Sequence, residues 1–143
     1  MIGKGLERTV DISTFFLDKL EYLPRIEKTA VYHDPCHLRH ALGVKNEPRE
    51  IIKNAGIGLI ETKDPGCCGF GGLFCMSNKE MAASFLNKRA EDIAGSKADT
   101  LITSCPGCII QLSRTIKDRP VIHLIELIEE AYCFRGEAQE RLF

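Results

Sequence analysis

Short apolar stretches alternate along this chain with longer stretches in which apolar residues recur every three to four positions. The short stretches are rich in β-branched residues and predict four strands, at 29–32, 57–62, 99–103 and 121–123. The longer stretches predict helices at 10–22, 48–54, 77–94, 106–116 and from 124 to about 133. Residues 33–46 are expected to form a loop with a single helical turn, and the polar tail after Cys133 is expected to fray. The alternation predicts an α/β fold, an open and mostly parallel sheet of about four strands with helices on both faces.

Several helix ends carry local signals. Asp11 or Ser13 is expected to cap the first helix. Ser77 and Glu80 have the spacing of a capping box, and Gly95 is expected to end the helix that they begin. The buried stripe of that helix is predicted to comprise Met81, Phe85, Leu86, Ala90 and Ile93.

Composition narrows the class of protein. The 143 residues are predicted to form one domain, with residues 10–132 as its core, and 44% of them are hydrophobic. A net charge of −1, the absence of Trp and no basic run longer than Lys88-Arg89 argue against a nucleic-acid partner. The N-terminus lacks the apolar stretch of a secretory signal, so the expected location is the cytoplasm, where thiols stay reduced.

Five of the seven cysteines come shortly after predicted strands. Cys36 follows the first strand, Cys67 and Cys68 follow the second, and Cys105 and Cys108 follow the third. In an open α/β sheet, ligands bind at the carboxyl ends of the strands. These five thiols are therefore expected to meet at one edge of the sheet.

Three kinds of chemistry are open to this set of thiols. A zinc ion takes four ligands, which leaves one thiol over. Cys105 and Cys108 form a CxxC pair with the spacing of a dithiol oxidoreductase, which leaves the other three without a role. An iron–sulfur cluster uses thiolates, and adjacent cysteines can bind different irons. A disulfide between Cys67 and Cys68 would be strained, because neighbouring Cα atoms are only about 3.8 Å apart.

The surroundings of the five cysteines suit an anionic, sulfur-ligated centre. Glycines allow backbone N–H groups to approach sulfur, and histidines can donate hydrogen bonds to sulfur or bind a metal. Each histidine could instead have a purely structural role, and the glycines could simply form a wide turn. The candidates for this surrounding layer are Gly69, Gly71, Gly72, His33, His37, His123 and Cys75. Asp34 is expected to be a turn or cap residue, and Cys133 is expected to have no role in the site.

Four strings together resemble the cysteine-rich CCG domain. They are HDPCHL at 33–38, PREII at 48–52, CCGFGG at 67–72 and CPGC at 105–108. The resemblance covers roughly residues 10–132. This family includes the cysteine-rich subunit of heterodisulfide reductase, the iron–sulfur subunit of glycolate oxidase and lactate-utilisation iron–sulfur proteins.

The resemblance implies a function and a ligand set. Cys36, Cys67, Cys68, Cys105 and Cys108 would bind a 4Fe-4S cluster, non-cubane in the best-understood members, although some family sites are thought to hold zinc. The chain would be an electron-transfer module of a glycolate or lactate oxidase, or of a heterodisulfide-reductase-like complex. Its partners would be a flavoprotein and a ferredoxin-like iron–sulfur domain, with a peripheral membrane complex formed through a partner.

The chain departs from the family in two respects. Family proteins typically carry two such domains, whereas this chain has one copy and no ferredoxin motif. The single copy predicts a C-terminal piece or split subunit of a longer oxidoreductase, and a purified sample would be metal-free or contain zinc if the lone domain does not hold its cluster. Two alternatives stay open, a zinc-stabilised interaction domain and a CxxC dithiol oxidoreductase. Cys75 is additional to the family pattern.

Overall fold

The computed structural model of this protein describes residues 10–17, 19 and 26–140, with side chains as far as residue 132. Most of the end of the predicted first helix, at 18 and 20–22, and the side chain of Cys133 fall outside what is described. Within the described part, no helix is long and apolar enough to cross a membrane.

Four parallel strands form the sheet, as the sequence predicts. They are β1 (Thr29–His33), β2 (Gly58–Ile60), β3 (Thr100–Thr103) and β4 (Val121–His123). Their order across the sheet is β2-β1-β3-β4, and every neighbouring pair is parallel. The chain leaves β1 toward one edge of the sheet and later returns to add β3 on the other side of β1. The carboxyl ends of β1 and β3 therefore border the crevice in which ligands of such sheets bind.

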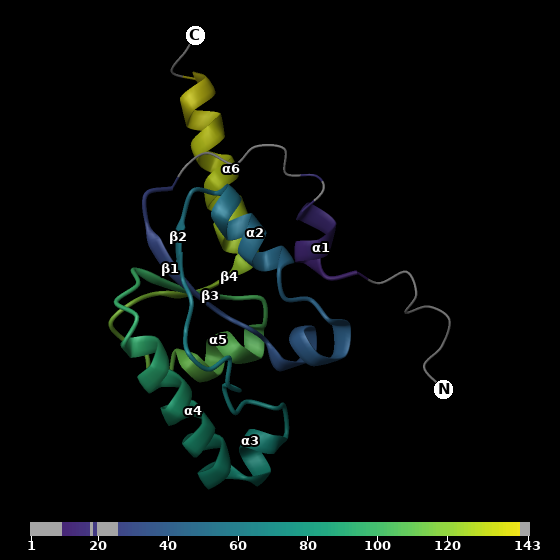
Figure 1. The fold of residues 1–143 in the computed structure, drawn as a ribbon, viewed down its shortest axis with the longest axis vertical. Helices are drawn as coiled ribbons and strands as arrows, with labels where there is room; N and C mark the ends of the chain where they lie inside the picture. The colour runs from purple at the N-terminus through teal and green to yellow at the C-terminus, as the bar shows by residue number, and fades with distance from the viewer. Residues whose placement is uncertain (1–9, 18, 20–25, 141–143) are drawn as a thin grey trace.

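Helices cover both faces of the sheet (Figure 1). One face carries α1 (Ile12–Leu17), α2 (Glu47–Asn54) and α6 (Leu124–Glu140), and the other carries α4 (Lys79–Ala94) and α5 (Pro106–Leu112). The short α3 (Phe74–Ser77) lies beside the start of α4. Between β1 and α2 the chain forms a single π-helical segment, η2 (His37–Leu42).

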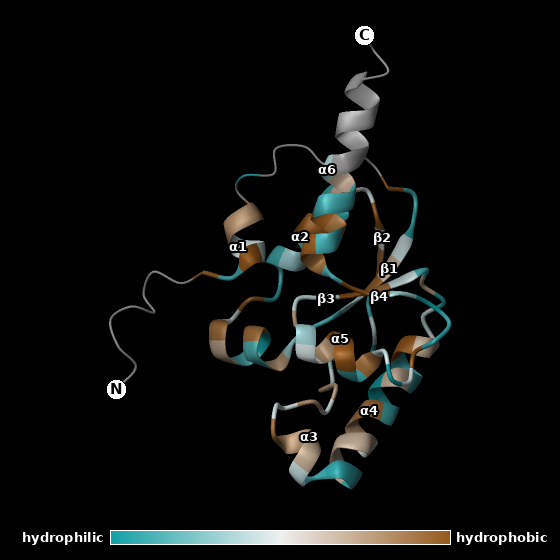
Figure 2. Ribbon diagram, turned by 180° about the vertical axis from the view of Figure 1, so that it is seen from behind, coloured by the Kyte–Doolittle hydropathy of each residue, from teal (hydrophilic) through white to brown (hydrophobic). Residues whose placement is uncertain are grey.

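Alternate residues of the strands supply two separate apolar cores. Ala30 and Tyr32 of β1 face a core made with α2 and α6, whereas Val31 faces a core made with α4 and α5. The second core also contains the side chains of Cys68 and Cys108. Figure 2 shows apolar residues concentrated in the central strands, with polar residues on parts of α2 and α4. Two of the candidate thiols are thus part of the packed interior.

Several helix details differ from the sequence-based expectations. Asp11 caps α1, as one of the two proposed caps, by accepting a hydrogen bond from the backbone N–H of Ser13 at 3.0 Å. The capping box is wrong, because Ser77 ends α3 and its hydroxyl donates to the carbonyl of Leu73. α4 begins only at Lys79, with Asn78 at its N-cap and no side-chain cap.

The predicted buried stripe of α4 is also partly wrong. Met81 is 55% exposed and Phe85 is 41% exposed, whereas Leu86, Ala90 and Ile93 are buried. α4 ends at Ala94 next to Gly95, as expected. The last helix does not stop near residue 133 but continues to Glu140.

Candidate metal centre

Two strand ends and one helix start define the site. β1 ends at His33 and is followed after two residues by Cys36. β3 ends at Thr103, and Cys105 then serves as the N-cap of α5. The first turn of α5 carries Cys108, because Pro106 fixes the backbone for helix initiation where no N–H is needed. The topology thus delivers four candidate residues to the crevice between β1 and β3, namely His33, Cys36, Cys105 and Cys108.

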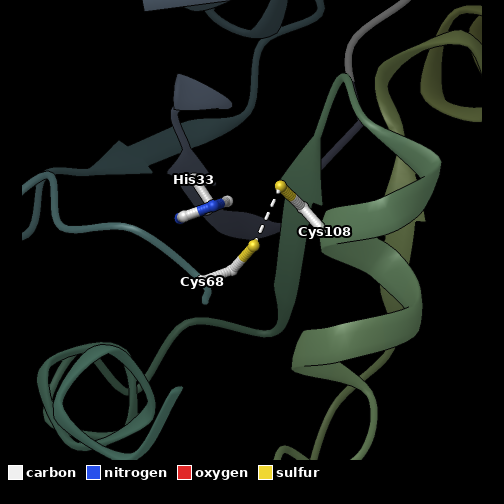
Figure 3. Close-up of side chains that lie close together, drawn as sticks. All are labelled: His33, Cys68 and Cys108. Atoms are coloured by element: carbon white, nitrogen blue, oxygen red, sulfur yellow. Dashed lines mark hydrogen bonds between the residues drawn. The ribbon is translucent and has the colours of Figure 1, made fainter. Parts of the chain in front are cut away.

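The innermost potential metal ligands are His33, Cys68 and Cys108 (Figure 3). The sulfur atoms of Cys68 and Cys108 lie 3.3 Å apart, and one ligand atom of each of the three residues lies within 4.8 Å of the others. All three side chains are buried, and none of the described cysteines is in a disulfide. The three donors come from a strand end, a loop and a helix, which accounts for their separation along the chain.

The loop that carries Cys67 and Cys68 is fixed by two close approaches. Gly69 has a φ of +78°, and a Cβ there would lie 2.4 Å from the backbone oxygen of Ala82 in α4. The ring of Phe70 packs directly on Gly107 in the first turn of α5, where a Cβ would lie 2.6 Å from the ring. Only glycine allows these two contacts, and they hold Cys68 against Cys108.

The pKa values of the site's cysteines are shifted in two opposite directions, and two of them are lowered. The pKa of Cys68 is lowered because its sulfur is hydrogen-bonded with the thiols of Cys108 and Cys67, against the opposing effect of burial. The pKa of Cys105 is lowered to about 5, because Cys108 donates to its sulfur and the backbone N–H groups of Cys108 and Gly107 also point at it, again against burial. Cys68 and Cys105 therefore favour the thiolate state that metal ligation requires.

Cys67 and Cys108 show the opposite shift, because their pKa values are raised. Hydrogen bonding to Cys68 and burial raise the pKa of Cys67, although the backbone N–H of Gly69 donates to its sulfur at 3.3 Å. The pKa of Cys108 is raised because its thiol is hydrogen-bonded with Cys105 and Cys68 and is buried. Cys36 lies close enough to Cys67 for its charge to contribute to the raised pKa of Cys67. Cys67 and Cys36 are both exposed, so they form the outer side of the site.

A buried ion pair anchors the segment that carries Cys36. Asp34 is 3% exposed, and its carboxylate accepts two hydrogen bonds from Arg49 at 2.7 and 2.8 Å. Burial alone would raise the pKa of Asp34, but the Arg49 hydrogen bonds and the charges of Arg49 and Arg39 lower it on balance. Asp34 is therefore not the turn or cap residue that the sequence suggested. It joins the strings at 33–38 and 48–52 instead.

A buried arginine contacts the site and is absent from the residues singled out in the sequence. Arg89 of α4 is 2% exposed, and its Nε donates to His33 Nδ1 at 3.0 Å. Its position was readable from the helical spacing, because 89 falls on the same face as the buried Leu86 and Ile93. The neighbouring Lys88 hides this signal, because two adjacent basic residues suggest surface charge.

The remaining candidate residues lie farther out or have other partners. His37 is exposed, although its charge contributes to lowering the pKa of Cys105. His123 Nδ1 accepts the backbone N–H of Ile125, which is a structural role at the start of α6. The Cys75 thiol donates to the carbonyl of Gly72 at 3.2 Å. Gly71 and Gly72 both have positive φ and shape the turn after the cysteine pair.

Solvent reaches one side of the site through a pocket of about 360 Å³. The pocket lies between the cysteine loop and α4, and its lining includes Cys67, Phe85, Lys88 and Arg89. The buried sulfurs of Cys68 and Cys108 are therefore backed by core, whereas Cys67 faces an opening.

The donor set fits a metal centre. Two buried sulfurs in contact, with further thiols on either side and backbone N–H groups directed at them, are what a thiolate-ligated metal requires. The buried Nε2 of His33 makes no close hydrogen bond within the described residues, and the His33 side chain is near enough to Cys68 to help lower its pKa, so a polar atom beside the sulfurs is available to a further group. The innermost three donors also suit a single zinc ion.

Comparison with known proteins also identifies a cysteine-rich domain in this chain. The model of the CCG family, described as a cysteine-rich domain, matches residues 30–113. A subunit of the fumarate reductase (CoM/CoB) of Methanothermobacter marburgensis is 36% identical over 138 residues, which is 90% of this chain and 28% of that protein. "Lactate utilization protein A" of Oceanobacillus iheyensis is 28% identical over 130 residues, 85% of this chain and 53% of that protein. The chain thus spans between about a quarter and about half of the length of these relatives.

Proposed function

This chain belongs to the CCG cysteine-rich domain family, and on that premise we propose that it is the iron–sulfur electron-transfer module of a larger oxidoreductase. The observation that carries the proposal is the contact between the buried sulfurs of Cys68 and Cys108, which come from different segments and meet beside His33. If these buried thiols are ionised, their desolvation and mutual repulsion cost free energy unless a cation balances their charge.

In this proposal five thiolates bind a 4Fe-4S cluster, with a non-cubane arrangement as in the best-understood family members. The ligands are Cys36, Cys67, Cys68, Cys105 and Cys108. When bound, such a cluster supplies the acceptance and release of single electrons. The count of five thiols favours a cluster over a single zinc ion, which takes four ligands.

The chain itself would orient and shield the centre. The core around Leu86, Leu101 and Leu112 excludes water from the inner sulfurs. The backbone N–H of Gly69 directs a hydrogen bond at Cys67, and the first turn of α5 directs N–H groups at Cys105. These hydrogen bonds to sulfur, together with burial, are the means by which a protein sets the potential of an iron–sulfur centre.

The parent assembly is proposed to be a 2-hydroxy-acid oxidase, for glycolate or lactate, or a heterodisulfide-reductase-like complex. One relative is named for lactate utilization and another as a subunit of a CoM/CoB fumarate reductase, which supports both versions. A flavoprotein and a ferredoxin-like iron–sulfur domain would supply the remaining electron path, in the cytoplasm or at the inner face of the membrane through a partner. The opening beside Cys67 is where a disulfide substrate or a redox partner would reach the centre.

Metal analysis of anaerobically purified protein tests the proposal. Iron and acid-labile sulfide near four of each per chain, with a broad visible absorption band, are expected. Cys68→Ser should abolish both. Cys75→Ser is the matched control and should keep both, because the Cys75 thiol is bound to Gly72. One zinc per chain without sulfide, in protein that also fails anaerobic reconstitution with iron and sulfide, would overturn the proposal in favour of a zinc-stabilised interaction domain.

A dithiol oxidoreductase is the second candidate, favoured by one observation. Cys105 precedes α5 and is half-buried, whereas Cys108 lies buried one turn later, which is the asymmetry of a reactive CxxC pair. That function predicts that Cys105→Ser abolishes disulfide reduction while Cys36→Ser spares it. If both substitutions remove bound metal together, the dithiol function fails.

A further inference from the structure

The proposal of an iron–sulfur centre leaves open what His33 does beside it. His33 is 1% exposed and ends β1, and the hydroxyl of Thr103 donates to its backbone carbonyl at 3.0 Å. One of its ring atoms lies within 4.8 Å of both inner sulfurs. The imidazole can face such a centre either as a metal ligand or as a hydrogen-bond donor, and the two roles need different ring protonation.

Arg89 decides between these roles. Its Nε donates to His33 Nδ1 at 3.0 Å. Its Nη1 is held by the hydroxyl of Thr62 at 2.9 Å, the carbonyl of Asp64 at 2.5 Å and the carboxylate of Asp92 at 2.8 Å. A guanidinium has only donors and is not deprotonated in proteins. Nδ1 of His33 must therefore accept, and the proton of the neutral ring must sit on Nε2.

We infer that Arg89 fixes His33 as an Nε2–H hydrogen-bond donor to the sulfurs of the centre, so that His33 is not a metal ligand. The inference rests on the proposed function for the identity of the centre, but the ring proton follows from the protein alone. Nε2 is buried and makes no close hydrogen bond in the described part of the chain, and the His33 side chain already helps to lower the pKa of Cys68, as expected for a donor that faces sulfur. Arg89 acts through His33 and is a positioning residue.

The polarity of the pair argues against ligation. A ligating histidine donates its second N–H to a carboxylate or a carbonyl, which strengthens the bond to the metal. Here the second nitrogen faces a donor instead. Ligation through Nε2 would require loss of the Arg89 hydrogen bond, or loss of the single N–H proton of the neutral ring.

A donor at this position has a definite effect on an iron–sulfur centre. A hydrogen bond to sulfur stabilises the reduced, more negative state more than the oxidised state. The buried positive charge of Arg89 acts in the same direction. His33 and Arg89 should together hold the reduction potential above the value that the thiolates alone would give.

The ring proton can be measured without any metal. In the full chain, prepared free of iron and zinc, long-range ¹H–¹⁵N correlation spectra should show Nε2 of His33 as protonated and Nδ1 as unprotonated. Lys88→Met, which removes a neighbouring exposed charge, should leave this pattern unchanged. A proton on Nδ1 of the wild-type ring would overturn the inference, whatever metal the site binds.

Two substitutions of His33 test the role toward the centre. His33→Gln keeps an N–H donor, and His33→Leu removes it. Both should retain iron and sulfide at the wild-type level after reconstitution. The midpoint potential in an EPR-monitored titration should shift to more negative values in His33→Leu, with His33→Gln closer to the wild type.

The outcomes separate this inference from the proposed function. Loss of iron in both variants, to the extent seen in Cys68→Ser, would make His33 a ligand and overturn the inference. An unchanged potential in His33→Leu would also overturn it. If the wild-type chain binds no iron under any condition, the proposed function fails, and the ring-proton measurement still decides the role of Arg89.

Discussion

The two faces of the sheet are built for different purposes. The face covered by α2 and α6 has a core made mainly of aliphatic side chains, including Ile51, Ile52 and Leu124 at 0–1% exposure, and the hydroxyl of Tyr32 in this core is hydrogen-bonded to Ser104. The face covered by α4 and α5 mixes aliphatic residues with two thiols, and His33 and Arg89 are buried beside it. One face is a conventional core, and the other is a core into which a polar site is set.

The two faces can differ in this way because successive side chains of a strand point to opposite faces of the sheet. Along β1, Ala30 and Tyr32 point to the apolar face, whereas Val31 points to the opposite face and His33, two residues on, follows it. A one-residue change of register would exchange the two sets. The apolar face therefore fixes the register on which the site depends, and damage to each face should show in a different measurement.

The largest expected effect on stability is on the apolar face. Ile52→Ala should lower the free energy of unfolding of the metal-free protein by about 4 kcal/mol, because it opens a cavity in a fully buried position. Urea unfolding followed by circular dichroism measures this. The counterpart, Cys108→Ser, should cost much less stability but should remove bound metal. If Ile52→Ala removed metal while the variant stayed folded, the separation of the two faces would be refuted.

Gly69 allows the loop with Cys67 and Cys68 to pack against α4, and its substitution should have the next largest effect on stability. Gly69→Ala should cost about 3 kcal/mol, because a Cβ would meet the backbone of α4 in a left-handed conformation. Gly72→Ala is the matched control, because Gly72 also has positive φ but nothing lies within 4 Å of an added Cβ. Its cost should be only about 1 kcal/mol. Equal losses in the two variants would mean that the contact with Ala82 does not matter.

The buried ion pair between Asp34 and Arg49 should have an intermediate effect on stability. Arg49→Met should lower the free energy of unfolding by about 2 kcal/mol, because it leaves the buried carboxylate of Asp34 without its main partner. Thermal unfolding at neutral pH measures this. Lys28→Met breaks the exposed pair with Glu130 and should change stability by less than about 1 kcal/mol. A comparable loss in both variants would contradict the assignment of Arg49 as a buried anchor.

The smallest expected effect concerns the extra thiol. Cys75→Ser should leave both stability and iron content near the wild-type values, because the serine hydroxyl can donate to Gly72 as the thiol does. Anaerobic reconstitution followed by iron and sulfide analysis measures the content. A loss of iron in this variant would add Cys75 to the site.

Much of the fold was predictable because its signals are local. The apolar runs at 29–32, 99–103 and 121–123 lie within a residue or so of β1, β3 and β4. The second strand was predicted as 57–62 but pairs only at Gly58–Ile60, because it is an edge strand with a partner on one side. The meeting of Cys68 and Cys108 followed from a topological rule and needed no knowledge of side-chain contacts.

Part of what was missed depends on contacts between distant segments. Nothing near Gly107 shows that Phe70, 37 positions earlier, packs on it, whereas the wrong capping box is a local miss because Ser77 donates to the carbonyl of Leu73 only four residues before it. η2 is a π-helical segment, which no apolar period announces. Arg89 is different, because its helical face was readable from the sequence but the residue was noted only as part of a short basic run.

The inner donors of the site are far apart in the sequence, and this has a consequence during biosynthesis. Cys68 and Cys108 are separated by 40 positions, and His33 and Arg89 by 56. The cavity therefore comes into being only after β3 has docked beside β1 and α5 has emerged from the ribosome. Shorter nascent chains lack part of the candidate ligand set, so under the proposed function the cluster would be inserted only after this stretch has been translated.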